Sequence, residues 1–406
     1  MKAKSILKWF AIPIVMALTA GVGLTGCGSS IPTTTTNNPP TTTPEGTTTA
    51  GTQALAPFPA TPVALNGSGA TFPAVLYTKW FDVFNQKYNV KINYQAVGSG
   101  SGISAITGLT VDFGASDGIM TDAQVTAATA AGGPILHIPM TSGSVVLTYN
   151  LTGIKSGDLK LSGDVLANIF LKNIKKWNDP AIVVLNPTLI LPNADITVVH
   201  RSDSSGTTNI FTNYLSKVST DWSIKIGSAN SVNWPGDLGA SGNAGLAAQV
   251  QQIPNSLGYV ELIYALQNNM SFAQMKNKSG NFIIPSLAST SAAAQGITLP
   301  DDMKIMITDS ANATAYPIAG FTWILVYQNQ TNKDKGAELV NFLWWALHDG
   351  ATYEADLSYA AIPADAVKKA EALIKSIKYQ GQPILPYGNP VIAAVIRWKM
   401  SPYHGF

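Results

Sequence analysis

The chain has 406 residues, of which 46% are hydrophobic and only 12% are charged, and its formal net charge at pH 7 is +2. So low a charged fraction, about half the usual share, excludes a strongly basic nucleic-acid surface as the main feature of the protein. The single cysteine, Cys27, excludes an internal disulfide and a cysteine-based zinc site. We hypothesise that so few ionisable groups suit an acidic exterior, in which carboxylates lose their charge.

Residues 1–27 are typical of a secretion signal. Three lysines precede an apolar run at 9–18, which is shorter than the roughly 20 residues that a membrane span needs. The signal ends in Leu24-Thr25-Gly26-Cys27, which resembles a bacterial lipoprotein cleavage box. We therefore predict that Cys27 carries a lipid that anchors the mature chain to a membrane. The protein would then lie outside the cytoplasm, in the periplasm or on the outer face of the cytoplasmic membrane. The alternative is a lone cysteine buried as an apolar residue.

Residues 28–61 are predicted to form a disordered tether. Thr, Pro, Gly and Asn dominate this segment, and Glu45 is its only charged residue, so it cannot build a core and acts as a spacer. The rest of the chain, from about Pro62, is long enough to bury a large core and to form two domains.

An apolar strand, a loop of small and hydroxyl residues and a helix recur as a unit along the chain. In the first unit, a strand begins at Val63 and the loop ends at Pro73, before a helix whose apolar face contains Leu76, Trp80, Val83 and Phe84. Thr71 is predicted to cap this helix, and Pro73 suits its first turn.

The second unit follows directly. Apolar and polar residues alternate from Val90 to Ala96, which predicts a strand, and the glycine-rich loop 98–102 leads to a helix expected to begin at Ile103. A further short strand, 111–115, ends at Ser116-Asp117-Gly118.

The third unit combines a strand at 196–200, the loop 201–208 and a helix. Strands that alternate with helices predict a mainly parallel sheet, and ligands of such sheets bind beyond the carboxyl ends of the strands. All three polar loops lie at that end. Later segments, 257–261 and 316–321, are predicted strands, and 336–348 is a predicted buried helix with Trp344 and Trp345 in the core.

The polar residues of these loops have the chemistry of an oxyanion site. Arg201 supplies a planar fork of donors, while hydroxyls and helix-start N–H groups donate without adding full charges. An ionised Asp117 can only accept, so it suits an anion that carries a proton, such as phosphate, and disfavours sulfate. Arg201 and Asp203 are two residues apart and could pair, although an ordinary surface ion pair is the alternative.

These loops resemble those of the phosphate-binding proteins of Pst-type ABC importers. The resemblance is carried, in family order, by 66–74 (NGSGATFPA), 94–100 (YQAVGSG), 111–117 (VDFGASD) and 199–207 (VHRSDSSGT). Segments 174–182, 233–235 and 258–261 extend it over nearly all of the chain after the tether.

The resemblance implies which residues bind phosphate: Thr71, Phe72, Ser99, Asp117, Arg201, Asp203, Ser205, Gly206 and Thr207. In this pattern Asp117 accepts the proton of the ligand, Arg201 forks onto phosphate, and Asp203 holds Arg201. The others donate from hydroxyl or backbone groups. Ser204 stands where the family often has glycine.

The resemblance also implies an α/β, two-lobed periplasmic-binding-protein-like fold of type II, the Venus flytrap, with mixed, mainly parallel sheets. Lobe I would comprise 62–141 and 316–406, and lobe II 142–315, with crossings near Thr141 and Tyr316. The expected partners are inorganic phosphate, the permease of an ABC importer and, through the lipid, a membrane. We expect a monomer that needs no cofactor or metal and binds no nucleic acid.

Four other functions compete with this interpretation. A phosphatase would need a base for Ser205, and none of the four histidines (His137, His200, His348 and His404) has metal-site spacing; His200 should face away from Arg201. A nucleotide hydrolase would need a Gly-Lys-Ser/Thr ending that neither glycine loop has. An adhesion or signalling module and a sulfate or molybdate carrier stay open as well.

Overall fold

The computed structural model describes residues 62–386. The predicted signal with Cys27, the whole predicted tether and the chain from residue 387 onward lie outside the described residues. The described part packs together as one unit, and within it no helix is both long enough and apolar enough to cross a membrane.

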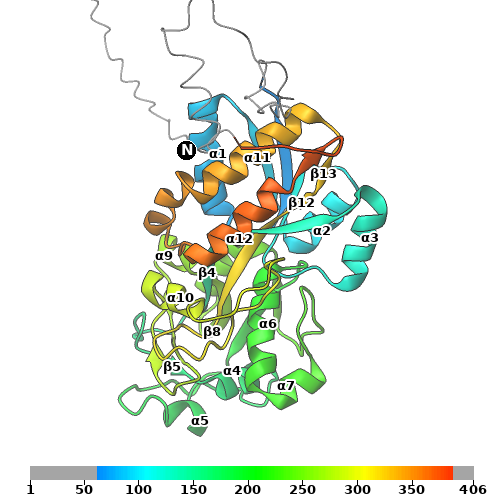
Figure 1. The fold of residues 1–406 in the computed structure, drawn as a ribbon. Coiled ribbons are helices and arrows are strands. Elements are labelled where there is room, and N and C mark those ends of the chain that lie inside the picture. The colour runs from blue at the N-terminus through cyan, green and yellow to red at the C-terminus, as the bar shows by residue number, and fades with distance from the viewer. Residues whose placement is uncertain (1–61, 387–406) are drawn as a thin grey trace, which may run out of the picture. The chain divides into compact units, whose positions relative to one another are not determined.

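A mixed sheet of nine strands runs through this unit, in the order β2-β1-β3-β12-β4-β8-β6-β7, with β9 paired to β4 (Figure 1). Its strands are β1 (Leu65–Gly69), β2 (Ile92–Ala96), β3 (Phe113–Ser116), β4 (Ile135–Tyr149), β6 (Thr197–Arg201), β7 (Leu238–Ala240), β8 (Ser256–Glu261), β9 (Ser271–Phe272) and β12 (Ala319–Tyr327). The pairs β1–β2, β1–β3, β6–β7 and β6–β8 are parallel. The pairs through β4 and β12 are antiparallel, so the sheet is mixed and the parallel pairs lie toward its two ends.

Strand β4 joins two groups of strands. Residues from Ile135 to Ser144 pair with β12, whereas residues from Val145 to Tyr149 pair with β8. We call β1, β2, β3 and β12 the first group and β6, β7 and β8 the second. The lobe boundaries expected near Thr141 and Tyr316 stay a prediction.

Two smaller sheets and the helices complete the unit. The smaller sheets contain β5 (Lys160–Leu161), β10 (Gln274–Lys276) and β11 (Phe282–Ile283), and β13 (Asn329–Gln330), β14 (Lys378–Tyr379) and β15 (Gln382–Pro383). The helices are α1 (Ala74–Tyr88), α2 (Ser99–Thr107), α3 (Asp122–Gly132), α4 (Gly163–Phe170), α5 (Pro180–Val183), α6 (Gly206–Val218), α7 (Thr220–Lys225), α8 (Gly242–Gln252), α9 (Leu262–Gln267), α10 (Leu287–Ala293), α11 (Lys333–Leu347) and α12 (Ala364–Lys375), with short 3₁₀ turns at Gly350–Tyr353 and Ala355–Leu357.

The core holds α1 against α11. Rings from α1 meet rings from α11, with 5.3 Å between the centroids of Phe81 and Phe342 and 5.4 Å between those of Phe84 and Trp345. Trp344 and Trp345 are both buried, which confirms their predicted place in the core. Because α1 is fixed by this packing, the loop that precedes it, between Gly69 and Ala74, is fixed as well.

Three predicted boundaries were wrong. Thr71 does not cap α1, because Pro73 occupies the N-cap position and no side chain bonds to the helix start. Helix α2 begins at Ser99, not at Ile103, since Gly98 takes a φ of 100° that directs the chain into the helix at once. Strand β12 begins at Ala319, three residues after Tyr316, which is buried in the preceding segment.

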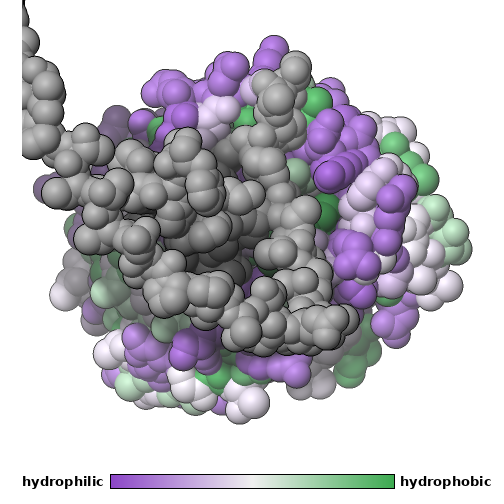
Figure 2. All heavy atoms as spheres, turned by 45° about the horizontal axis from the view of Figure 1, so that its top comes forward, coloured by the Kyte–Doolittle hydropathy of each residue, from purple (hydrophilic) through white to green (hydrophobic). Residues whose placement is uncertain are grey.

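Where the face in Figure 2 is coloured by hydropathy, hydrophilic and weakly hydrophobic residues lie side by side, and strongly hydrophobic residues cover smaller areas.

Candidate functional site

Three of the predicted loops meet at the start of helix α6. The Ser99 hydroxyl, at the first residue of α2, accepts hydrogen bonds from the backbone N–H of Asp117 at 3.2 Å and of Gly206 at 2.9 Å. A Cβ atom added at Gly206 would lie only 2.6 Å from Asp117 Oδ2. The residues after β3 and β6 are therefore in direct contact through the start of α2.

Arg201 and Asp203 form a pair in which the guanidinium is buried. The Arg201 side chain is 1% exposed and its Nε donates to Asp203 Oδ1 at 2.6 Å, while its second terminal nitrogen donates to Oδ2. The Gly242 N–H also donates to Asp203, at 3.0 Å. Burial favours the neutral form of Asp203, but the hydrogen bonds and charge of Arg201 outweigh it and lower the pKa of Asp203. The alternative of an ordinary surface ion pair is wrong.

Asp117 lies in the same cluster but forms no ion pair with a cation of residues 62–386. It is 1% exposed, and the Thr322 hydroxyl on β12 donates to its Oδ1 at 2.8 Å. Burial raises the pKa of Asp117 to about 7, while the Thr322 hydrogen bond, the charge of Arg201 and Ser99 oppose the rise. Asp117 can therefore change protonation state near neutral pH.

The loop before α1 supplies backbone and hydroxyl groups. Phe72 is fully buried and its carbonyl accepts from the Tyr359 hydroxyl at 2.6 Å, but its N–H has no hydrogen-bond acceptor among residues 62–386. The Thr71 hydroxyl accepts from the side chain of Asn243 at 2.9 Å. An unpaired buried N–H costs free energy unless a partner is supplied, so this loop is suited to hold an acceptor.

The start of α6 completes the set. Ser205 is the N-cap and its hydroxyl accepts from the Thr208 N–H at 3.1 Å. The Thr207 hydroxyl lies 3.4 Å from Arg201 Nη1. A 13-residue helix thus directs its positive end toward Asp117 and Ser99, as an anion site requires.

The structure brings the nine predicted residues into one cluster. Four residues that sequence reasoning missed form hydrogen bonds to members of it: Gly242, Asn243, Tyr264 and Thr322. Gly242 and Asn243 follow the strand β7 and open α8, which repeats the strand, loop and helix pattern of the other loops. This pattern is hard to recognise in the sequence because the strand β7 has only three residues. Thr322 was detectable only as a hydroxyl within an otherwise apolar strand.

His200 points away from this cluster, as its position in the strand predicted. Its ring stacks on Trp234, with 5.0 Å between the centroids. Among residues 62–386, no group of three or more His, Cys, Asp or Glu side chains is placed to hold a metal ion.

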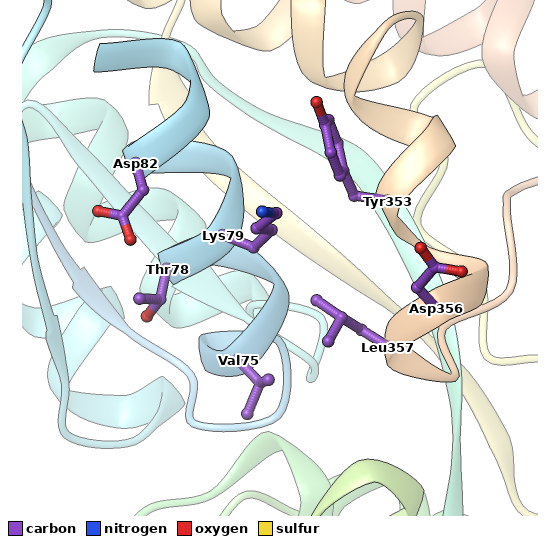
Figure 3. Close-up of a pocket in the computed structure, with 7 residues that line it drawn as sticks. All are labelled: Val75, Thr78, Lys79, Asp82, Tyr353, Asp356 and Leu357. Atoms are coloured by element: carbon purple, nitrogen blue, oxygen red, sulfur yellow. The ribbon is translucent and has the colours of Figure 1, made fainter. Parts of the chain in front are cut away.

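A separate surface pocket of about 360 Å³ lies between α1 and the turns at Gly350–Tyr353 and Ala355–Leu357 (Figure 3). Lys79 Nζ lies 5.2 Å from the centre of the Tyr353 ring, and Asp82 and Asp356 stand on opposite sides. None of the predicted binding residues lines this pocket, so it is not the candidate site.

Comparison with known proteins places the chain in a family. Residues 40–349 match the model of the PBP superfamily domain. The chain is 41% identical to phosphate-binding protein PstS of Haemophilus influenzae over 315 residues, which are 77% of this chain and 93% of that protein. It is 37% identical to phosphate-binding protein PstS of Methanocaldococcus jannaschii over 338 residues, 78% of this chain and 87% of that protein. The chain belongs to the PstS family of phosphate-binding proteins.

Solved structures agree on the fold. A high-affinity periplasmic phosphate-binding protein bound with phosphate has a TM-score of 0.61 and 21% identity, over 76% of this chain and 93% of the other. A phosphate-binding protein from Stenotrophomonas maltophilia has a TM-score of 0.60 and 21% identity, over the same shares of both chains. The predicted α/β, two-lobed periplasmic-binding-protein fold is confirmed.

Proposed function

We propose that this protein binds inorganic phosphate outside the cytoplasmic membrane and delivers it to an ABC-type phosphate importer. The observation that carries the proposal is the shared cluster of Asp117 and Arg201, both at most 3% exposed and both in contact with the first turn of α6 or its neighbour Ser99. An acceptor and a guanidinium fork around a helix N-terminus suit an anion that still carries a proton. Phosphate is such an anion near neutral pH, whereas sulfate carries no proton.

Each predicted residue has a proposed role in this site. Arg201 contacts phosphate oxygens while Asp203 holds its guanidinium, and Asp117 accepts a ligand proton. The remaining residues donate from hydroxyl or backbone groups: Thr71, Phe72, Ser99, Ser205, Gly206 and Thr207. The relatives named phosphate-binding proteins, which this chain matches at 41% identity, support phosphate as the ligand.

The two lobes are proposed to close on the ligand, with lobe I at 62–141 and 316–406 and lobe II at 142–315. The change of partner along β4 between Ser144 and Val145 supports a crossing near this point. Closure would bury phosphate, and a permease can recognise the closed form.

The proposed location is the outer face of the membrane or the periplasm, with a lipid on Cys27 as the anchor. The lysine-rich start and the Leu24-Thr25-Gly26-Cys27 box support it. Replacement of Cys27 by serine is expected to release the protein from the membrane fraction. A Cys27→Ser protein that still sediments with membranes would contradict the anchor.

We also propose that the protein is not an enzyme and acts as a monomer without a cofactor. The names of its relatives describe binding. Sustained hydrolysis of an aromatic phosphate ester by the clean protein would favour a phosphatase instead.

Calorimetry on protein dialysed free of phosphate tests the binding proposal. Phosphate should bind tightly at one site, arsenate should compete with it, and sulfate should bind at least roughly 10⁴-fold more weakly. No phosphate binding, or sulfate binding of equal strength, would show that the site has another ligand.

A further inference from the structure

Asn243 connects the two sides of the candidate site, although its role is not explained by the predicted set of ligands. It is fully buried at the second residue of α8. Its side-chain nitrogen lies 2.9 Å from the Thr71 hydroxyl and 3.2 Å from the Thr207 hydroxyl. Thr71 follows β1 of the first strand group, and Thr207 follows β6 of the second, so one amide contacts a hydroxyl from each.

The orientation of this amide is determined by its other neighbour. The backbone N–H of Glu261 lies 2.9 Å from the side-chain oxygen of Asn243. A backbone N–H can only donate, so the atom that faces it must be the oxygen. The NH₂ group must then face the two threonine hydroxyls, and it can donate one hydrogen to each.

Both hydroxyls are consequently saturated as acceptors. Thr71 Oγ1 accepts from the Asn243 side chain and also from the Asn243 backbone N–H at 3.2 Å. Thr207 Oγ1 accepts from the Asn243 side chain and faces Arg201 Nη1 at 3.4 Å. A hydroxyl has two acceptor positions and one hydrogen, so the hydrogen of each threonine is left to be donated elsewhere.

We propose that Asn243 is a positioning residue that fixes the hydroxyls of Thr71 and Thr207 as hydrogen-bond donors toward the bound oxyanion. This rests on the proposed function of the site. The two hydroxyls then donate hydrogen bonds to the ligand, and Asp117 accepts one from it. A ligand must then present acceptor oxygens to both threonines and a proton only to Asp117, which describes a partly protonated tetrahedral oxyanion.

Without Asn243, either hydroxyl could rotate and present a lone pair to the ligand. A lone pair facing an anionic oxygen is repulsive, and the ligand would lose the hydrogen bond as well. Asn243 therefore acts on affinity through Thr71 and Thr207, and its effect should vanish when those hydroxyls are removed.

The experiment is a mutational cycle on the full chain, with phosphate affinity measured by calorimetry at pH 8. Asn243→Asp keeps the size of the side chain and the acceptor for Glu261, but an ionised carboxylate cannot donate, so the threonines turn toward it. Affinity should fall roughly 10- to 150-fold for each ligand hydrogen bond that is lost. In a Thr71→Val, Thr207→Val background, the same change should cost at least about tenfold less than in the parent, because only the effect of its added charge then remains.

Charge alone needs a separate control, because Asn243→Asp also adds a negative charge near an anion. Asn209→Asp adds the same charge on α6 beside Gly118 without touching either threonine. Its effect on affinity should be the same in both backgrounds. If Asn243→Asp also costs the same in both backgrounds, its effect is only charge or structure and the proposal is wrong.

Asn243→Leu removes donation without adding charge and should show the same dependence on the two hydroxyls. Denaturant unfolding of each variant separates affinity from stability. Variants that lose stability while phosphate affinity is unchanged would overturn the proposal. If the parent chain itself binds no phosphate, the proposed function fails first, whereas parent binding with an additive cycle refutes only the role of Asn243.

Discussion

Asp117 and Arg201 lie in one buried cluster, but only Arg201 has an oppositely charged partner there. Arg201 has a carboxylate partner in Asp203, which keeps its charge compensated without ligand. The Asp117 carboxylate accepts from the Thr322 hydroxyl and forms no ion pair within residues 62–386, and burial raises its pKa to about 7. The cluster thus holds a permanent cation and a carboxylate whose charge depends on pH and on the ligand.

Asp117→Asn should reduce discrimination against sulfate more than it reduces phosphate binding. The amide can donate to an unprotonated oxygen, which the carboxylate cannot do. Calorimetry with both anions is best carried out at pH 8.5, where the parent carboxylate is ionised because its pKa is about 7. Equal phosphate-to-sulfate affinity ratios in variant and parent would contradict this role for Asp117.

Arg201→Ala should weaken phosphate binding by several kcal/mol, on the order of 10³-fold or more, because it removes a charge-assisted fork and leaves Asp203 without its cation. The matched variant Arg201→Lys keeps the charge but loses the planar fork, so an intermediate affinity is expected. The measurement is calorimetry, with denaturant unfolding to check the fold. Unchanged binding by the alanine variant would mean that the site is elsewhere.

The elements meet at this site only because glycines allow their backbones to approach. The N–H of Gly100, in the first turn of α2, donates to the carbonyl of Ser204 at 2.9 Å. A Cβ at Gly98 would lie 2.5 Å from Asp203 Oδ2, and one at Gly100 would lie 2.1 Å from the Ser204 hydroxyl. Side chains at these positions would separate α2 from the loop before α6.

Gly206→Ala tests this close approach. The added methyl would lie 2.4 Å from Ser99 Oγ and 2.6 Å from the Asp117 backbone nitrogen, so one of the loops must move. Phosphate affinity should fall by about 10²-fold, since a shift of about 1 Å in a positioned group can cost that much.

Gly245→Ala is the control for that substitution, since it lies in α8 with no atom within 4 Å of the added methyl. It should raise the free energy of unfolding by about 0.5–1 kcal/mol through helix propensity and leave affinity unchanged. The same helical preference favours alanine at position 206, so a loss there must come from the contact. Equal affinities for Gly206→Ala and the parent protein would show that the loops have room to separate.

The whole molecule buries carboxyl groups without giving each a cation. Asp117, Glu261 and Glu354 are each at most 2% exposed. Burial raises the pKa of Glu354 to about 8 and that of Asp117 to about 7, and it raises the pKa of Glu261 well above its ordinary value. At a pH above the ordinary carboxyl pKa values, the folded protein therefore still binds protons that the unfolded chain has released.

The free energy of unfolding should rise as the pH falls from 8.5 to 6.5. A folded pKa above the unfolded value makes folding take up protons, and each such group contributes up to about 1.4 kcal/mol per pH unit. Below pH 6.5, buried His137 opposes this trend, because its pKa is lowered to about 3 and the unfolded chain then binds a proton that the folded protein excludes.

Denaturant unfolding across this pH range checks the trend, and Glu354→Gln should flatten it. A stability that rises from pH 6.5 to 8.5 would contradict the prediction. A stability optimum near neutral pH, with unfolding by pH 4, would count against the hypothesis of an acidic exterior.

The sequence by itself determined the strand, loop and helix units and the chemistry of their polar residues. This was possible because hydrophobic periodicity and short motifs depend only on residues that are close in the sequence. The loops around Thr71, Ser99, Asp117 and Arg201 were therefore predictable, and so was the burial of Trp344 and Trp345.

The tertiary structure decided which groups face one another. Thr322 lies 205 residues from Asp117 and Asn243 lies 172 residues from Thr71, and local pattern contains no information about such pairings. It also decided that α2 starts at Ser99, where Gly98 takes a φ of 100° and the N–H of Gly100 in the first turn finds a partner in the Ser204 carbonyl. Hydrogen-bond direction and pKa depend on the full set of neighbours around an atom, and only the folded chain supplies that set.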